Sequence, residues 1–146
     1  MHRFASLVLA ALVLAACAKP IPPVGRWAGN YDAQGTMIDA RLEIGGDGLV
    51  RVSAPDISNV VVASQDDRAA MHERLASELA EGWDQVMPRA MDFDGQVFRK
   101  PGGVAPQIEW DKTNQRMTLV VYFGANPPIY VALHPVADFS NDPWAD

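Results

Sequence analysis

Cysteine, histidine and positive charge are scarce in this chain, and each shortage excludes a class of protein. One cysteine cannot form an intrachain disulfide, and three histidines leave few ligands for a zinc site. Twelve lysines and arginines stand against 18 aspartates and glutamates, for a formal net charge of −6. Because binding to nucleic acid needs a basic face, we expect no nucleic acid partner.

The main apolar run is short and lies at the N-terminus. It extends from Phe4 to Ala16, is broken only by Ser6, and follows the positive charge of Arg3. A membrane-spanning helix needs about 20 apolar residues, so this run is too short to cross a bilayer. A basic start followed by a short apolar stretch is typical of a secretory signal, and we predict that residues 1–16 are a signal peptide that is removed.

The run ends in Leu14-Ala15-Ala16-Cys17, which resembles the lipobox of bacterial lipoproteins. The resemblance implies cleavage before Cys17, a diacylglyceryl thioether on the Cys17 sulfur, and acylation of the freed amine, with palmitate among the expected chains. Several acyl chains would hold the protein on a membrane in effect permanently, because each buried methylene adds about 0.8 kcal/mol. A plain secretory signal followed by a chance cysteine is the alternative.

Residues 17–24 are expected to form the lipidated end and a short tether. Three prolines, at positions 20, 22 and 23, favour an extended spacer that holds the domain close to its membrane. In lipoproteins an Asp directly after the cysteine retains the protein at the inner membrane. Ala18 occupies that position here, so the resemblance implies attachment to the outer membrane, facing the periplasm.

The remaining residues, 25–146, are predicted to be a single globular periplasmic domain, because about 130 residues after the leader are enough for one core. Alternation of apolar and polar residues is clearest at 36–44, where the apolar set faces one side and Asp39, Arg41 and Glu43 face the other. This is typical of a half-buried strand. Similar patterns predict strands at 25–31, 36–44, 49–54, 60–63, 90–93, 96–99, 108–111, 117–123 and 129–134.

A different period, with apolar residues every three or four positions, predicts one helix at about 66–86. Ser64 is placed to cap its start and Pro88 to stop it. We therefore predict the α+β class: a curved antiparallel sheet or partial β-barrel of roughly eight strands, with one helix packed on it. The length of the apolar stripe favours a helix that fills the sheet with Met71, Leu75, Leu79 and Trp83.

Gly25-Arg26-Trp27 is similar to the Gly-x-Trp opening of lipocalins. This second resemblance implies a barrel-like shape and a cavity beside Trp27 for a small amphiphilic ligand. Lipocalins pack an arginine from a late strand over that tryptophan, and the last predicted strand here has none.

The sequence contains few residues arranged for catalysis or metal binding. No free nucleophile stands beside a base, and His72 and His134 are best explained as structural or surface residues. Asp92, Asp94, Glu109 and Asp111 form the best carboxylate cluster for Ca²⁺ or acid–base chemistry, but turns and the polar sides of strands explain them better. We expect no catalytic residue, no metal, no cofactor and no enzymatic activity.

Aromatic residues give the one indication of binding. Tyr122, Tyr130 and His134 fall on one side of two neighbouring strands, where they could contact a protein or a lipid headgroup. With Trp27 they form the candidate binding surface. We expect a non-catalytic protein-binding or envelope accessory module that reaches its membrane through the lipid anchor. A lipocalin-like carrier of a small amphiphile is the alternative.

Overall fold

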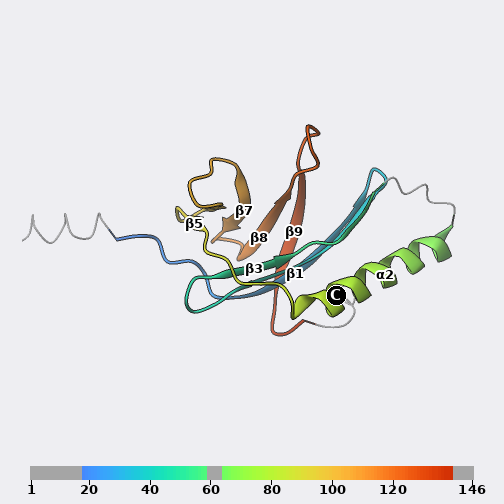
Figure 1. Ribbon diagram of the computed structural model, residues 1–146, viewed down its shortest axis with the longest axis horizontal. Helices are drawn as coiled ribbons and strands as arrows, with labels where there is room; N and C mark the ends of the chain where they lie inside the picture. The colour runs from blue at the N-terminus through green and yellow to red at the C-terminus, as the bar shows by residue number, and fades with distance from the viewer. Residues whose placement is uncertain (1–17, 59–63, 140–146) are drawn as a thin grey trace, which may run out of the picture.

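A computed structural model describes residues 18–58 and 64–139, which form one curled antiparallel sheet and one helix lying against its outside (Figure 1). The predicted leader, Cys17, the strand expected at 60–63, and Trp144 lie outside the described residues. The strands are β1 (Gly25–Ala33), β2 (Thr36–Ile44), β3 (Val50–Ser53), β4 (Asp56–Ser58), β5 (Asp92–Phe93), β6 (Val97–Arg99), β7 (Pro106–Asp111), β8 (Arg116–Val121) and β9 (Ile129–Val136).

The strands are joined in the order β3-β2-β1-β9-β8-β7-β6-β5, and β4 pairs separately with β2. Each pairing is antiparallel. The predicted α+β class and the curved antiparallel sheet with one helix are therefore confirmed. Asp94 and Gly95 form the hairpin turn that their sequence indicates, with Gly95 at φ 102° and the Asp94 carboxylate accepting the backbone N–H groups of Gln96 and Val97.

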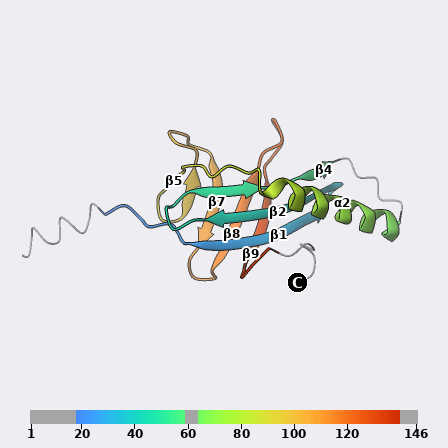
Figure 2. The same ribbon diagram turned by 60° about the horizontal axis from the view of Figure 1, so that its bottom comes forward.

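The sheet curls until its two halves share one apolar core. Trp27 on β1 meets Trp110 on β7 edge to face, with ring centroids 6.0 Å apart, although two strands, β9 and β8, lie between β1 and β7 in the sheet order. Figure 2 shows β1, β2 and β3 running across β8 and β9. The alternate residues that face inward from both halves are almost fully buried: Ile38, Ala40, Leu42, Ile44, Val50, Phe98, Ile108, Met117, Leu119, Val131 and Leu133.

Helix α2 (Gln65–Trp83) packs on the outer face of β2 and β4, on the side away from β5, β7 and β8 (Figure 1). Its buried Leu75 contacts Met37 of β2, and Met71 and Ile57 pack around this pair. The expectation that helix residues fill the inside of the sheet is thus wrong. Strand side chains already occupy the inner core, and the apolar stripe of the helix covers the opposite face.

The helix begins as its sequence indicates and ends earlier. The Ser64 hydroxyl accepts the Asp67 backbone N–H at 3.1 Å, which satisfies one of the free donors of the first turn. The last helical residue is Trp83, three residues before the expected end. The guanidinium of Arg51 donates to the carbonyl oxygens of Trp83 and Val86, so a basic side chain from β3 satisfies the C-terminal end.

The polar side of β2 is buried as well, so the interpretation of residues 36–44 as a half-buried strand is wrong. Asp39 is 0% exposed and Arg41 is 5% exposed. The C-terminal tail contributes to this cover: the Phe139 ring lies 5.0 Å from the Arg41 guanidinium carbon and packs edge to face on Trp83. Burial is the largest influence on Arg41 and lowers its pKa, while nearby Asp138 acts in the opposite direction.

Candidate ligand cleft

The sheet does not close, because its two ends, β3 and β5, are not paired with each other. The chain from 84 to 91, called here the crossing segment, leads from the end of α2 past β3 to β5 (Figure 1). It is fixed to β3 by two backbone hydrogen bonds between Val50 and Arg89, with N···O distances of 2.9 and 2.8 Å. The crossing segment therefore spans the open side of the sheet.

A cleft of about 610 Å³ lies between this segment and the facing strands. Clefts that hold small molecules typically measure about 300–1,000 Å³. One wall comes from β3 and the crossing segment, and the other from β7, β8 and the turn after β6. The lining residues are Val50, Val52, Gln85, Val86, Met87, Arg89, Ala90, Met91, Lys100, Pro101, Gln107, Ile108 and Leu119.

The floor of the cleft is apolar and continuous with the inner core. Val50, Ile108 and Leu119 belong to that core, and each is at most 6% exposed. The rim is more open, since 71% of Met87 and 36% of Val52 are exposed. The flexible thioether of a methionine adapts to apolar ligands of irregular shape, so Met87 and Met91 suit a binding wall.

Arg51 holds the crossing segment in place. Besides its bonds to the end of α2, its guanidinium donates to the Glu43 carboxylate at 3.1 Å and lies 4.4 Å from the centre of the Trp83 ring. The Arg26 side chain donates to the other oxygen of the same carboxylate at 2.7 Å. The wall of the cleft that carries Val86 and Met87 is thus anchored by a network of charged hydrogen bonds.

Charge is distributed unevenly around the cleft. Its lining includes two cations, Arg89 and Lys100, and no carboxylate among the described residues. Val50 and Arg89 stand directly opposite each other in an antiparallel bridge, so their side chains leave the backbone on the same face. Because Val50 faces the inner core, the Arg89 side chain leaves the crossing segment on the side that faces the cleft.

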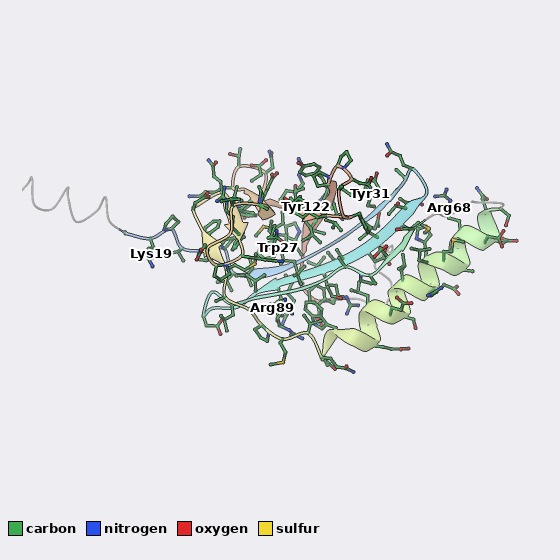
Figure 3. All side chains as sticks on the ribbon, turned by 45° about the horizontal axis from the view of Figure 1, so that its top comes forward. Lys19, Trp27, Tyr31, Arg68, Arg89 and Tyr122 are labelled. Carbon is green, nitrogen blue, oxygen red and sulfur yellow. The ribbon has the colours of Figure 1, made fainter. Side chains whose placement is uncertain are left out.

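The tether lies against the same end of the sheet. A β-carbon on Gly95 would come within 3.7 Å of the Pro20 ring, and one on Gly48 within 3.9 Å of the Pro22 ring. These glycines belong to the β5–β6 and β2–β3 turns, at the two open edges. In Figure 3 the tether residue Lys19 lies at the opposite end of the molecule from Arg68 on α2.

The four residues of the sequence-predicted binding surface do not form one site. Trp27 is 4% exposed and sits in the core, away from the cleft lining. In the view of Figure 3, Tyr122 and Arg89 lie on opposite sides of Trp27. Tyr122 and Tyr130 are 43% and 55% exposed on the outer face of β8 and β9, with the exposed His134 further along β9. The Tyr122 hydroxyl donates to the Pro106 carbonyl at 2.6 Å, which fixes its ring.

Tyr130 also borders a second, wider groove of about 700 Å³ at the far end of β1 and β9. The two strands pair only over Arg26 to Ala28 and diverge beyond it. The groove is lined by several rings and by polar side chains: Tyr31, Gln34, Thr36, Ser58, Phe123, Asn126, Pro127, Pro128, Ile129 and Tyr130.

The acidic residues serve turns. Arg99 and the Gln96 and Val97 backbone N–H groups bind the Asp94 carboxylate and lower its pKa to about 2. Asp92 accepts the Gly102 N–H, and Asp111 accepts the Asn114 N–H. Across 18–58 and 64–139 no group of three or more histidines, cysteines or acids is placed to hold a metal ion. In the same ranges no helix is long and apolar enough to cross a membrane.

Sequence reasoning missed the cleft residues. The crossing segment reads Asp84-Gln85-Val86-Met87-Pro88-Arg89-Ala90-Met91, without alternation or helical period after Val86. The predicted helix takes its first three residues and the predicted strand at 90–93 its last two. Two methionines around a proline were the available signal. No sequence signal indicates Lys100 as a cleft residue, because only the fold brings the turn after β6 opposite β3. Searches against protein-family models, curated proteins and solved structures find no match to this chain.

Proposed function

We propose that this protein is a bacterial lipoprotein, held by lipid on Cys17 at the outer membrane and facing the periplasm, whose domain binds a small amphiphile without catalysing its conversion. The leader and Leu14-Ala15-Ala16-Cys17 support the proposed export and lipid attachment. The observation that supports the activity is the 610 Å³ cleft with an apolar floor, left open because α2 packs outside the sheet.

Three features of the cleft suit an amphiphile. The buried floor of Val50, Ile108 and Leu119 offers apolar surface for a hydrocarbon chain, whereas the exposed rim leaves a polar end in water. The tether packs at the open edges of the sheet, so lipidation at Cys17 would hold this side near the membrane from which a ligand comes.

The binding proposal is tested by filling the cleft. The full-length chain is purified from the cells that express it and irradiated with a photoreactive long-chain fatty acid, and the labelled peptides are mapped by mass spectrometry. Labelling should concentrate on the crossing segment and disappear in Val52→Trp, whose indole occupies the rim. Val104→Trp is the matched control, because Val104 is 90% exposed and does not line the cleft. Equal labelling of the two variants would rule out this cleft.

The proposed lipid attachment at Cys17 is tested separately. Cys17→Ser should abolish incorporation of labelled palmitate and release the protein from the membrane fraction, because serine offers no thiol for the diacylglyceryl transfer. Ala18→Ser, one residue further along, should change neither result. Membrane attachment that survives Cys17→Ser would contradict lipid anchoring.

A protein-binding or accessory role is the second candidate, favoured by the exposed rings of Tyr122 and Tyr130 on the outer face of β8 and β9. Photocrosslinkers placed at position 130 in cells should then capture one specific envelope protein. The same crosslinker at position 104 serves as the control for non-specific capture. Similar capture patterns at the two positions would remove this candidate.

A further inference from the structure

The charges around the cleft run against the charge of the protein. The chain carries a formal net charge of −6, yet no carboxylate lines the cleft among the described residues and two cations do. The cleft lining therefore carries positive charge on a protein whose net charge is negative. A cleft with this lining favours an anion at its mouth.

Most other arginines are already neutralised by a partner. Five of them form ion pairs with carboxylates: Arg26, Arg51, Arg68, Arg74 and Arg99. Arg89 and Lys100 form none with any residue in 18–58 or 64–139. Arg89 uses its backbone to hold the crossing segment to Val50, which leaves its guanidinium available to a ligand.

The two cations come from opposite walls. Arg89 leaves the crossing segment on the same face as the buried Val50, at the β3 side. Lys100 directly follows β6 and lines the wall formed with Gln107 and Ile108. Both side chains are exposed. An acidic group at the mouth can therefore meet a positive charge from each side while its chain lies on the apolar floor.

We propose that the cleft selects a single-chain amphiphile with a carboxylate head, a long-chain fatty acid, over its uncharged counterpart, and that Arg89 and Lys100 determine this selectivity. This inference rests on the proposed amphiphile-binding function. A guanidinium matches a carboxylate with two parallel hydrogen bonds, and an ammonium adds a second charge.

The rest of the lining favours a small head group. Apart from the two cations, its polar side chains are the amides of Gln85 and Gln107. The hydroxyls and ester oxygens of a glycerophosphate head would need more partners than these to replace their water. A volume of about 610 Å³ lies in the middle of the range for small-molecule sites and suits one chain better than the two chains of a phospholipid.

The test compares heads on the same chain. The full-length chain is irradiated with a photoreactive fatty acid, the corresponding alcohol and a lysophospholipid of equal chain length, and labelling of the crossing segment is measured against concentration. The fatty acid should bind about tenfold more tightly than the alcohol, a ratio that corresponds to about 1.4 kcal/mol. The lysophospholipid should bind more weakly than the fatty acid.

Variants assign the selectivity to the two side chains. Arg89→Gln and Lys100→Gln should each weaken fatty acid binding more than alcohol binding, and the double variant should abolish the preference. Arg89→Lys should retain most of it, because the charge remains. Lys112→Gln, in the turn after β7, is the matched control: Lys112 is exposed, does not line the cleft and has no ion pair within the described ranges.

Each outcome decides a different claim. Equal binding of acid and alcohol at the cleft, or a preference that survives the double variant, overturns the inference and leaves the binding function standing. Tighter binding of the lysophospholipid overturns the choice of a carboxylate head. Absence of labelling at the crossing segment with every probe overturns the binding function and the inference together. Far-ultraviolet circular dichroism of each variant separates lost binding from lost folding.

Discussion

The inner face of β2 is apolar and its outer face is mainly polar, and both are largely buried. Its inner face carries Ile38, Ala40, Leu42 and Ile44, each at most 1% exposed. Its outer face carries Met37, Asp39, Arg41 and Glu43, of which the first three are at most 5% exposed and Glu43 is partly exposed. The apolar residues of the alternating pattern therefore mark the face on the inside of the curled sheet. The polar residues do not mark a face that is exposed to water.

The difference lies in what covers each face. Strand side chains from β6 to β9 cover the inner face and form a continuous apolar core. A single helix and the residue Phe139 cover the outer face, where the buried side chains of Met37 and Leu75 pack together. Burying the polar side of a strand requires partners for its charges, which is why the outer cover includes rings and hydrogen bonds as well as aliphatic contacts.

The largest effect is expected from the inner face. Leu42→Ala removes a fully buried side chain from the middle of β2 and leaves a cavity that strands on both sides cannot fill. Such substitutions cost about 2–5 kcal/mol of unfolding free energy, and we expect about 3 kcal/mol. Urea unfolding of the variant and the parent chain measures the loss. A loss below that of the outer-face variant described next would mean that the helix layer, and not the curled sheet, dominates stability.

The outer cover should contribute less and act independently of the cleft. Leu75→Ala opens the contact with Met37, and we expect a loss of about 2 kcal/mol, at the low end of the range for core truncations because the layer is thin. Since α2 packs on the face opposite the inner core, labelling of the crossing segment by a photoreactive fatty acid should persist. Lost labelling in a folded Leu75→Ala protein would show that the helix and the cleft are coupled.

Much of the fold could be predicted because local patterns dictate it. The inward alternation of β2, the Asp94-Gly95 turn and the Ser64 cap each act within a few residues, and each is found where the sequence places it. The end of α2 was misplaced because a side chain distant in sequence, Arg51, supplies the hydrogen bonds that terminate it. Such a partner leaves no trace in the helical period.

The side of the sheet on which α2 packs could not be predicted. The stripe of Leu75, Leu79 and Trp83 fits either face of a sheet, and the choice depends on how completely strand side chains fill the inside. The cleft was missed for the same reason. Its two cations are 11 positions apart, in an irregular segment and a turn, and only the gap between β3 and β5 brings them together.

A smaller effect is expected at the start of α2. Ser64→Ala removes the hydroxyl that accepts the Asp67 N–H, and loss of such a cap typically costs about 1 kcal/mol. Ser64→Thr should restore most of the stability, because its hydroxyl can accept the same backbone N–H and also donate to the Asp67 carboxylate as Ser64 does. Thermal unfolding compares the three proteins. Equal stability of Ser64→Ala and the parent would show that the helix is held by its packing alone.

The smallest effect concerns pH and is expected at the contact between α2 and the end of β1. His72 on α2 points its Nε2 toward the Asp32 carboxylate at 3.5 Å, and Arg68 contacts the same carboxylate. Burial is the largest influence and lowers the His72 pKa from its ordinary value of 6.5, partly opposed by Asp32 and assisted by Arg68. The unfolded chain therefore binds a proton more readily than the folded one, so stability should fall as the pH drops below 6.5. The loss is complete once the pH is below the folded pKa.

His72→Gln cannot titrate and should flatten the change in unfolding free energy between about pH 7 and pH 5.5, a window that lies above the usual range of carboxylates. His134→Gln, at the exposed histidine of β9, is the matched control for the substitution itself. If the parent is as stable at the lower pH as at the higher one, or if His72→Gln shows the same loss, the imidazole is not held neutral between α2 and β1.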